Sequence, residues 1–273
     1  MSKQYHTQSG LAEINGANLY YDVQGSGPPL LLLHAGIADS RMWDAQMDAF
    51  SASYQVIRFD MRGFGQSNMP SGTFSNADDV KEILDFLGVK AAYVLGISFG
   101  GLVAVDFALT HPGYVKGLIL GAPSVSGAKP SDRIKQFWDE EDTALENGDL
   151  EGATELNLRL WVDGPHRQPD QVDTALRTKM HTMQMEIFQK DIPDDIEEID
   201  LDPPALERLG DINIPVQLIV GDLDLDEKII LVDKLAAELT ISHKVVMPGV
   251  AHMLNMENPE LFNHTVLDFL AKV

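Results

Sequence analysis

The feature that most restricts the fold of this chain is a serine between glycines, at the junction of an apolar run and a helical stretch. Residues 91–95 are strand-like and residues 99–109 carry helical spacing, with Gly96-Ile-Ser-Phe-Gly between them. A strand-to-helix turn this tight strains its middle residue, and larger side chains at the flanking positions would collide across it. The pattern predicts that Ser98 is lifted out of the packing beside a helix N-terminus that favours an oxyanion.

The rest of the chain alternates short apolar runs with amphipathic stretches, which is typical of a mainly parallel sheet covered by helices on both faces. Further strands are expected at residues 18–24, 29–33, 54–59, 115–120, 216–220 and 244–247. Residues 25–29 resemble a hairpin turn between the first two of these strands. Helices are expected at residues 41–50, at 76–87 with Asn76 as its N-cap, at 227–239, and from Pro259 onward.

Residues 124–209 have a different character, with long helical stretches and no convincing strand. We therefore expect a core domain at 1–123 and 210–273, interrupted by a helical insertion at 124–209. Seven of the residues in 191–202 are acidic, which indicates a solvated face or loop of that insertion.

Composition excludes several classes of protein. The 42 acidic residues exceed the 20 basic ones, for a net charge of −22, and the chain has no cysteine. A hydrophobic content of 44% is too high for a disordered acidic tail, and the absence of thiols excludes a disulfide scaffold, a cysteine nucleophile and thiolate metal sites. The negative surplus repels phosphate backbones and anionic headgroups, so we expect neither a nucleic acid nor a membrane partner.

We expect no targeting signal in this chain. The first ten residues are polar and do not resemble a secretory signal, and the longest aliphatic run, residues 30–33, is far shorter than the ~20 residues that span a bilayer. We expect a cytoplasmic protein that acts as a monomer or homodimer.

A nucleophilic serine needs a histidine base and a carboxylate that orients the histidine. Of the eight histidines, His252 follows the strand expected at 244–247, so it lies at the carboxyl ends of the strands, where Ser98 also lies. Asp222, Asp224 and Asp226 follow the strand expected at 216–220, and spacing does not choose among them. A calcium loop is disfavoured, because the glycine and glutamate of that motif are missing.

These motifs resemble the α/β-hydrolase superfamily over essentially the whole chain. His34-Ala-Gly resembles the His-Gly-x loop of that family, with Ala35 in place of a glycine. Residues 60–67 resemble its Asp-x-Arg-Gly-x-Gly-x-Ser turn, and His111-Pro112 resembles the pair that closes the helix after the nucleophile. The resemblance implies the α/β-hydrolase fold: a mostly parallel eight-stranded sheet flanked by helices, with a helical cap insertion.

The resemblance also implies roles for individual residues. It selects Asp224 as the acid and His252 as the base, assigns the oxyanion hole to the N–H groups of Gly36 and Phe99, and makes His34 structural. It implies neither a metal nor an organic cofactor. The insertion corresponds to a cap that shapes the substrate pocket, and the residues expected to line that pocket are Ile37, Trp138, Trp161, Met183 and Met253.

The expected activity is hydrolysis of carboxylic esters of small-to-medium, largely uncharged substrates through an acyl-enzyme on Ser98. Serine at this position argues against dehalogenase and epoxide hydrolase relatives, which carry aspartate there. The alternatives are an enol-lactonase of the 3-oxoadipate type or another lactonase, a C–C hydrolase, a cofactor-free perhydrolase, and a non-catalytic ligand receptor. The C–C hydrolase is less favoured because Met253 stands where that group tends to carry tryptophan. A local Arg159 or Arg177 would help the site accept an anionic substrate.

Overall fold

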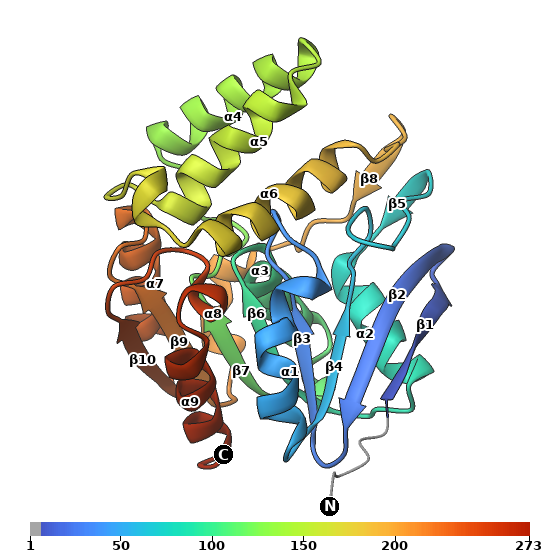
Figure 1. The fold of residues 1–273 in the computed structure, drawn as a ribbon. Coiled ribbons are helices and arrows are strands. Elements are labelled where there is room, and N and C mark those ends of the chain that lie inside the picture. Colours follow the sequence, from blue (N-terminus) through green and yellow to red (C-terminus); the bar gives the residue numbers. More distant parts are fainter. Residues whose placement is uncertain (1–6) are drawn as a thin grey trace, which may run out of the picture.

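The computed structural model describes residues 7–273, which are built around an eight-stranded sheet (Figure 1). His6, in the polar start of the sequence, lies outside this range. Across the sheet the order is β1 (Thr7–Ile14), β2 (Ala17–Gly25), β4 (Gln55–Phe59), β3 (Pro29–Leu33), β6 (Ala92–Ile97), β7 (Val115–Gly121), β9 (Val216–Gly221) and β10 (Ser242–Met247). The pairs β1–β2 and β2–β4 are antiparallel and the other pairs are parallel, so the carboxyl ends of the parallel strands meet at one edge.

Helices on both faces of the sheet explain the purely apolar run of β3. Leu30 and Leu32 pack into a core with α1 (Asp44–Ser51) and α9 (Pro259–Leu270), whereas Leu31 and Leu33 pack into a core on the opposite face. The second core is closed by α2 (Asn76–Phe86), α3 (Phe99–Thr110) and α7 (Asp226–Glu238). A strand buried on both faces has no position for a polar side chain, so its sequence does not alternate.

Residues 124–209, called the helical segment below, contain α4 (Asp132–Glu146), α5 (Leu150–Asn157), a π-helical turn at Leu158–Asp163 and α6 (Thr174–Phe188). Figure 1 shows these helices beyond one edge of the sheet. Lys179 of α6 donates to Asp44 Oδ2 at 2.7 Å and to the Arg41 carbonyl at 2.8 Å. These bonds join the helical segment to the core.

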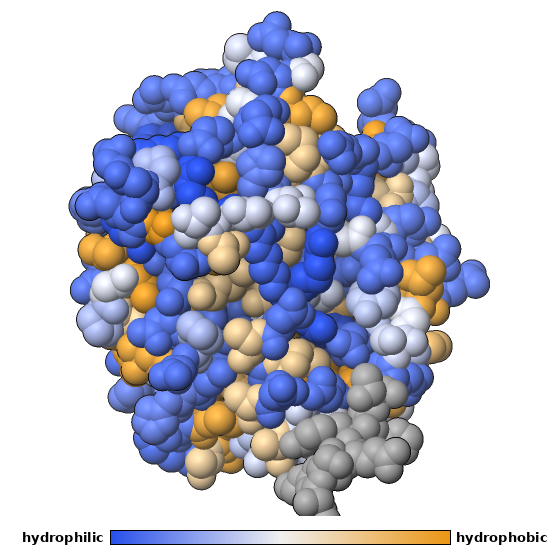
Figure 2. Space-filling model, in the orientation of Figure 1, coloured by the Kyte–Doolittle hydropathy of each residue, from blue (hydrophilic) through white to orange (hydrophobic). Residues whose placement is uncertain are grey.

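The remaining elements are short. They comprise α8 (Leu254–Glu257) and 3-10 turns at Ser40–Trp43, Pro112–Tyr114, Pro169–Gln171, Ala205–Glu207 and Leu209–Asp211. None of the helices in residues 7–273 combines the length and the apolar character that crossing a membrane requires. Hydrophilic residues cover most of the face seen in Figure 2, with hydrophobic residues scattered among them.

Several local predictions are wrong. The helical segment contains a strand, β8 (Ile196–Glu198), which pairs with β5 (Gly72–Phe74). A three-residue strand in an acidic run carries little periodicity, and its partner lies more than a hundred residues away. The N-cap of α2 is Ser75, whose hydroxyl accepts from the Asp78 N–H at 3.2 Å, and Asn76 is the first helical residue.

The predicted position of the hairpin is also wrong. Residues 25–29 do not form one, because β2 and β3 each pair with β4, which lies between them. The tight hairpin joins β1 to β2 at Asn15-Gly16, with φ values of +46° and +79°. Asn-Gly is the preferred pair for such a turn, because both residues tolerate positive φ. The strand β1 itself is absent from the sequence-based prediction.

Candidate active site

Ser98 occupies the turn between β6 and α3 with φ +55° and ψ −114°, a conformation that residues other than glycine rarely adopt. A Cβ added at Gly96 would lie 2.1 Å from the Gly100 carbonyl oxygen, and one at Gly100 would lie 2.2 Å from that of Leu33. Both positions therefore require glycine, as the sequence predicts: Gly96 because the turn closes on itself, and Gly100 because the turn packs against the end of β3.

The backbone of Ser98 is held on both sides. Its N–H donates to the Gly121 carbonyl at 2.9 Å, and its own carbonyl accepts from the N–H groups of Gly101 and Ser124, each at 2.9 Å. Ser98 remains partly exposed. The turn thus presents a hydroxyl on a fixed backbone at the carboxyl end of β6.

His252 and Asp224 form a buried pair in the loops that follow β10 and β9. Nδ1 of His252 lies 2.9 Å from Oδ2 and 3.1 Å from Oδ1 of Asp224, and each side chain is at most 2% exposed. Asp222 and Asp226, the other two aspartates that spacing left open, are both exposed. Asp222 instead accepts from the Gly249 N–H at 2.6 Å.

The second nitrogen of His252 is available. Within residues 7–273, Nε2 of His252 is buried and makes no hydrogen bond. A carboxylate only accepts, so Nδ1 of His252 donates to Asp224, and in a neutral imidazole Nε2 then carries the lone pair. This is the tautomer that a general base needs.

The two residues expected to form an oxyanion hole come from different parts of the chain and lie against each other. A Cβ added at Gly36 would lie 3.4 Å from the Cβ of Phe99. Phe99 is the first residue of α3, so its N–H has no acceptor within the helix. Gly36 follows β3 in the loop that begins with His34.

His34 is tied into the scaffold. It is fully buried, its Nε2 accepts from the Met61 N–H at 3.0 Å, and its Nδ1 donates to the Ala35 carbonyl at 2.9 Å. Burial lowers the pKa of His34, so the imidazole is neutral. Both ring nitrogens are thus used within the fold.

Trp161 brings the helical segment against the histidine. Its ring centroid lies 4.7 Å from that of His252, at an interplanar angle of 40°, and the Phe137 ring meets it edge-on at 6.0 Å. Lys228 Nζ lies 5.7 Å from the Trp161 ring centroid. Sequence reasoning missed Lys228, for which the available signal was a basic residue among the acidic ones that open α7.

The other residues expected to line a pocket separate into two groups. Ile37, Met183 and Met253 are buried in one apolar cluster, against which Trp161 packs. Trp138 does not belong to that cluster: it is 47% exposed on α4, and its neighbour Phe137 makes the contact with Trp161. The lining of a substrate pocket by these residues stays a prediction.

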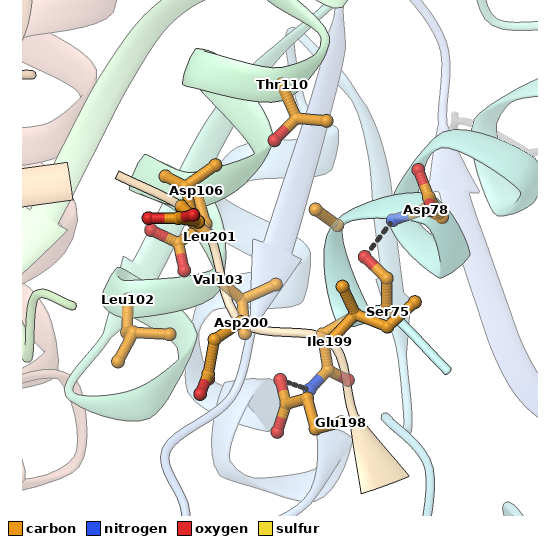
Figure 3. A pocket seen from close by; sticks show the side chains of 13 residues that line it. Ser75, Asp78, Leu102, Val103, Asp106, Thr110, Glu198, Ile199, Asp200 and Leu201 are labelled. Atoms are coloured by element: carbon orange, nitrogen blue, oxygen red, sulfur yellow. Dashed lines mark hydrogen bonds between the residues drawn. The ribbon is translucent and has the colours of Figure 1, made fainter. Parts of the chain in front are cut away.

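A separate cavity of about 150 Å³ lies between α2, α3 and the chain after β8 (Figure 3). Asp106, Glu198 and Asp200 contribute carboxylates to it. Burial, opposed by a hydrogen bond from Ser126, raises the pKa of Asp106 to about 6. Across residues 7–273, no group of three or more histidine, aspartate or glutamate side chains is placed to hold a metal ion.

Comparison with known proteins agrees with this architecture. The family model described as the α/β hydrolase fold matches residues 28–259. The chain belongs to the α/β-hydrolase family, and it is a hydrolase.

Individual relatives differ in activity. The chain is 29% identical to a 2-hydroxy-6-oxononadienedioate/2-hydroxy-6-oxononatrienedioate hydrolase of Paraburkholderia phymatum, over 99% of this chain and 96% of that protein. It is 25% identical to the carboxylesterase YbfK of Bacillus subtilis, over 89% and 80%. The enol-lactonase structure from Burkholderia xenovorans LB400 has the same fold, with a TM-score of 0.78, 22% identity, and coverage of 96% and 100%.

Proposed function

We propose that this hydrolase cleaves carboxylic esters of small-to-medium, largely uncharged substrates through an acyl-enzyme on Ser98. The proposal rests above all on the buried His252–Asp224 pair, in which Nε2 of His252 has no hydrogen-bond partner within residues 7–273. An imidazole that is oriented by a carboxylate and keeps one nitrogen free can activate a serine. A carboxylesterase among the relatives supports the choice of ester substrates.

The proposed mechanism assigns one task to each group. Nε2 of His252 takes the proton of the Ser98 hydroxyl while Oγ attacks the acyl carbonyl, and Asp224 stabilises the imidazolium. The N–H groups of Gly36 and Phe99 receive the oxyanion, and each such donor contributes about 3 kcal/mol to transition-state stabilisation. His252 returns the proton to the leaving alcohol, and water then cleaves the acyl-enzyme by the same sequence.

The proposed substrate class follows from the surroundings of His252. The helical segment serves as a cap, and Trp161, Ile37, Met183 and Met253 supply an apolar lining in which the flexible methionines accommodate different acyl chains. The net charge of −22 lowers the local concentration of anions. Arg159 and Arg177, which could have bound an anionic substrate, are both paired with the buried carboxylate of Asp163.

The test is hydrolysis of p-nitrophenyl esters from short to long acyl chains by the native protein, Ser98→Ala and Ser53→Ala. Ser53 is exposed and far from the turn in sequence, so its variant controls for the loss of a hydroxyl. We expect Ser98→Ala to lose more than about 10³-fold in kcat/KM. Ser53→Ala retains native activity, and the chain-length optimum reports the depth of the pocket.

Equal, weak hydrolysis by the native protein and Ser98→Ala would contradict the proposal. The same protein would then be assayed on lactones and on substrates of C–C hydrolysis, the activity that the name of the Paraburkholderia relative suggests. Mass spectrometry after treatment with a fluorophosphonate identifies the nucleophile independently, because the label should attach to Ser98.

A further inference from the structure

Lys228 is a buried cation close to the proposed triad. It lies in the first turn of α7, four residues after Asp224, and is 8% exposed. Its Nζ donates to Ser124 Oγ at 2.8 Å and to the Pro123 carbonyl at 3.4 Å, and lies 5.7 Å from the ring centroid of Trp161. Within residues 7–273 its direct partners are thus a hydroxyl, a carbonyl and an aromatic face, without an ion pair to a carboxylate.

An ammonium at this place is unfavourable for folding. Burial without a paired carboxylate disfavours the charge, and the N-terminal end of a helix disfavours a cation. Burial outweighs the attraction of Asp224 and Glu227 and lowers the pKa of Lys228 to about 8. By contrast Lys234, two turns further along α7, is exposed and lies 3.9 Å from Glu238.

The partners of Lys228 contact two of the proposed catalytic residues. Its ammonium faces Trp161, whose ring lies 4.7 Å from the ring of His252. It also binds the hydroxyl of Ser124, whose backbone N–H donates to the carbonyl of Ser98 at 2.9 Å. One cation therefore contacts both residues that pack against the base and the nucleophile.

We propose that Lys228 is a positioning residue for the proposed triad: its ammonium holds Trp161 against His252 and Ser124 against the Ser98 turn, and its positive charge disfavours protonation of the imidazole. A cation over an aromatic face attracts the ring, which fixes the wall on which the imidazole rests. This inference rests on the proposed function, because it assumes that His252 acts as the base.

The other charges near His252 do not replace this effect. The negative charge of Asp224 favours the imidazolium form of His252. It therefore stabilises the charge formed during the reaction, but it also promotes protonation of His252 before the reaction begins. Glu257 of α8 accepts from the Ala251 N–H at 2.9 Å and pairs with Arg167 at 2.5 Å, so its charge is balanced. Lys228, for which no ion pair with a carboxylate exists within residues 7–273, therefore adds a positive charge that opposes the effect of Asp224.

The first test measures the titration of the His252 imidazole in the resting protein, without substrate. Histidine titrations are followed by NMR in the native protein, Lys228→Gln and Lys234→Gln, with the His252 signal assigned from its loss in His252→Gln. Glutamine at 228 retains an N–H donor for Ser124 and removes only the charge. The two ring-centroid distances place the ammonium within about 10 Å of the imidazole, and at that separation we expect the His252 midpoint to rise by about one pH unit in Lys228→Gln.

Lys234→Gln removes one positive charge from the exposed part of α7, so it should leave the midpoint of the His252 titration unchanged. The native protein provides a second measurement if Lys228→Gln does not fold. Its His252 signal should show a further inflection near pH 8, where Lys228 loses its proton. An unchanged midpoint in a folded Lys228→Gln, or a native signal without that inflection, would overturn the proposal.

Kinetics separate positioning from substrate binding. In Lys228→Gln the acid limb of kcat/KM should move up by about one pH unit. Activity at neutral pH should fall by the same factor for a p-nitrophenyl butyrate and for the anionic p-nitrophenyl hemisuccinate. A loss confined to the hemisuccinate, with the acid limb in place, would show that Lys228 binds a substrate carboxylate instead.

Full activity of Ser98→Ala would contradict the proposed function, whereas the NMR result would stand independently.

Discussion

His252 and Asp224 are 28 residues apart in the chain, yet Nδ1 of one lies 2.9 Å from Oδ2 of the other. They meet because β9 and β10 are parallel neighbours, with Gly221 paired with Met247, so the two following loops begin at the same height. A Cβ added at Gly221 would lie 2.2 Å from the Val250 carbonyl oxygen, which shows how closely these loops approach. The sheet thus sets the geometry of the pair.

Asp224→Asn should reduce kcat about 10⁴-fold, because the amide stabilises the wrong imidazole tautomer without a large change of shape. Asp226→Asn is the matched control, since Asp226, the exposed first residue of α7, lies two positions after Asp224 and its substitution should leave kcat near the native value. The kcat of each variant is measured on the p-nitrophenyl ester that the native protein hydrolyses best. Equal losses in the two variants would contradict the role of Asp224.

Gly100→Ala should lower the free energy of unfolding by at least about 2 kcal/mol, because the added methyl overlaps the Leu33 carbonyl at 2.2 Å. Gly113→Ala is the control: no atom lies within 4 Å of the corresponding Cβ. Urea denaturation of the two variants gives the difference. A Gly100→Ala protein as stable as Gly113→Ala would show that the turn is less tightly packed than the structure indicates.

Asp79→Asn should cost about 3 to 5 kcal/mol of unfolding free energy, because it leaves the guanidinium of Arg62 buried without its partner. The two side chains are each 3% exposed and meet at 2.5 Å, and Arg62 also donates to the carbonyls at the end of β1. Asp85→Asn, on the same helix, breaks an exposed pair with Lys81 and should cost less than about 1 kcal/mol. Thermal and urea unfolding should rank the variants in that order.

Asp106 should make the native protein less stable as pH rises from about 4 to about 6. Its pKa is raised from an ordinary 3.8 to about 6 by burial, with Glu198 and Asp200 of the same cavity adding repulsion (Figure 3). In that pH range the folded state holds more protons than the unfolded chain, so the free energy of unfolding declines as pH rises. The loss is complete above the pKa of Asp106 in the folded protein.

Asp106→Asn should remove this decline and be more stable than the native protein at pH 7, because the amide oxygen still accepts from Ser126. Asp132→Asn, at a fully exposed position, should keep the native pH profile. Unfolding free energies from pH 4 to pH 8 test both expectations. A native-like slope in Asp106→Asn would assign the pH dependence to other groups.

Local chemistry explains which features could be predicted. A turn that tolerates no Cβ demands glycine at 96 and 100, and strands buried on both faces demand unbroken apolar runs such as β3. These constraints act within a few residues, so the sequence by itself determined the strand–turn–helix unit at Ser98 and the parallel α/β architecture. It also restricted the acid to three aspartates, of which the family resemblance selected Asp224.

Other features depend on residues far apart in the chain, and only the tertiary structure decided them. The hairpin at Asn15-Gly16, the pairing of β5 with β8, and the stack of Lys228, Trp161 and His252 each arise from how separate segments pack. The sequence near Lys228 does not show that this lysine is buried, because its partners Trp161 and Ser124 lie in other parts of the chain. Short-range patterns encode backbone form, whereas the surroundings of a side chain are set by long-range contacts.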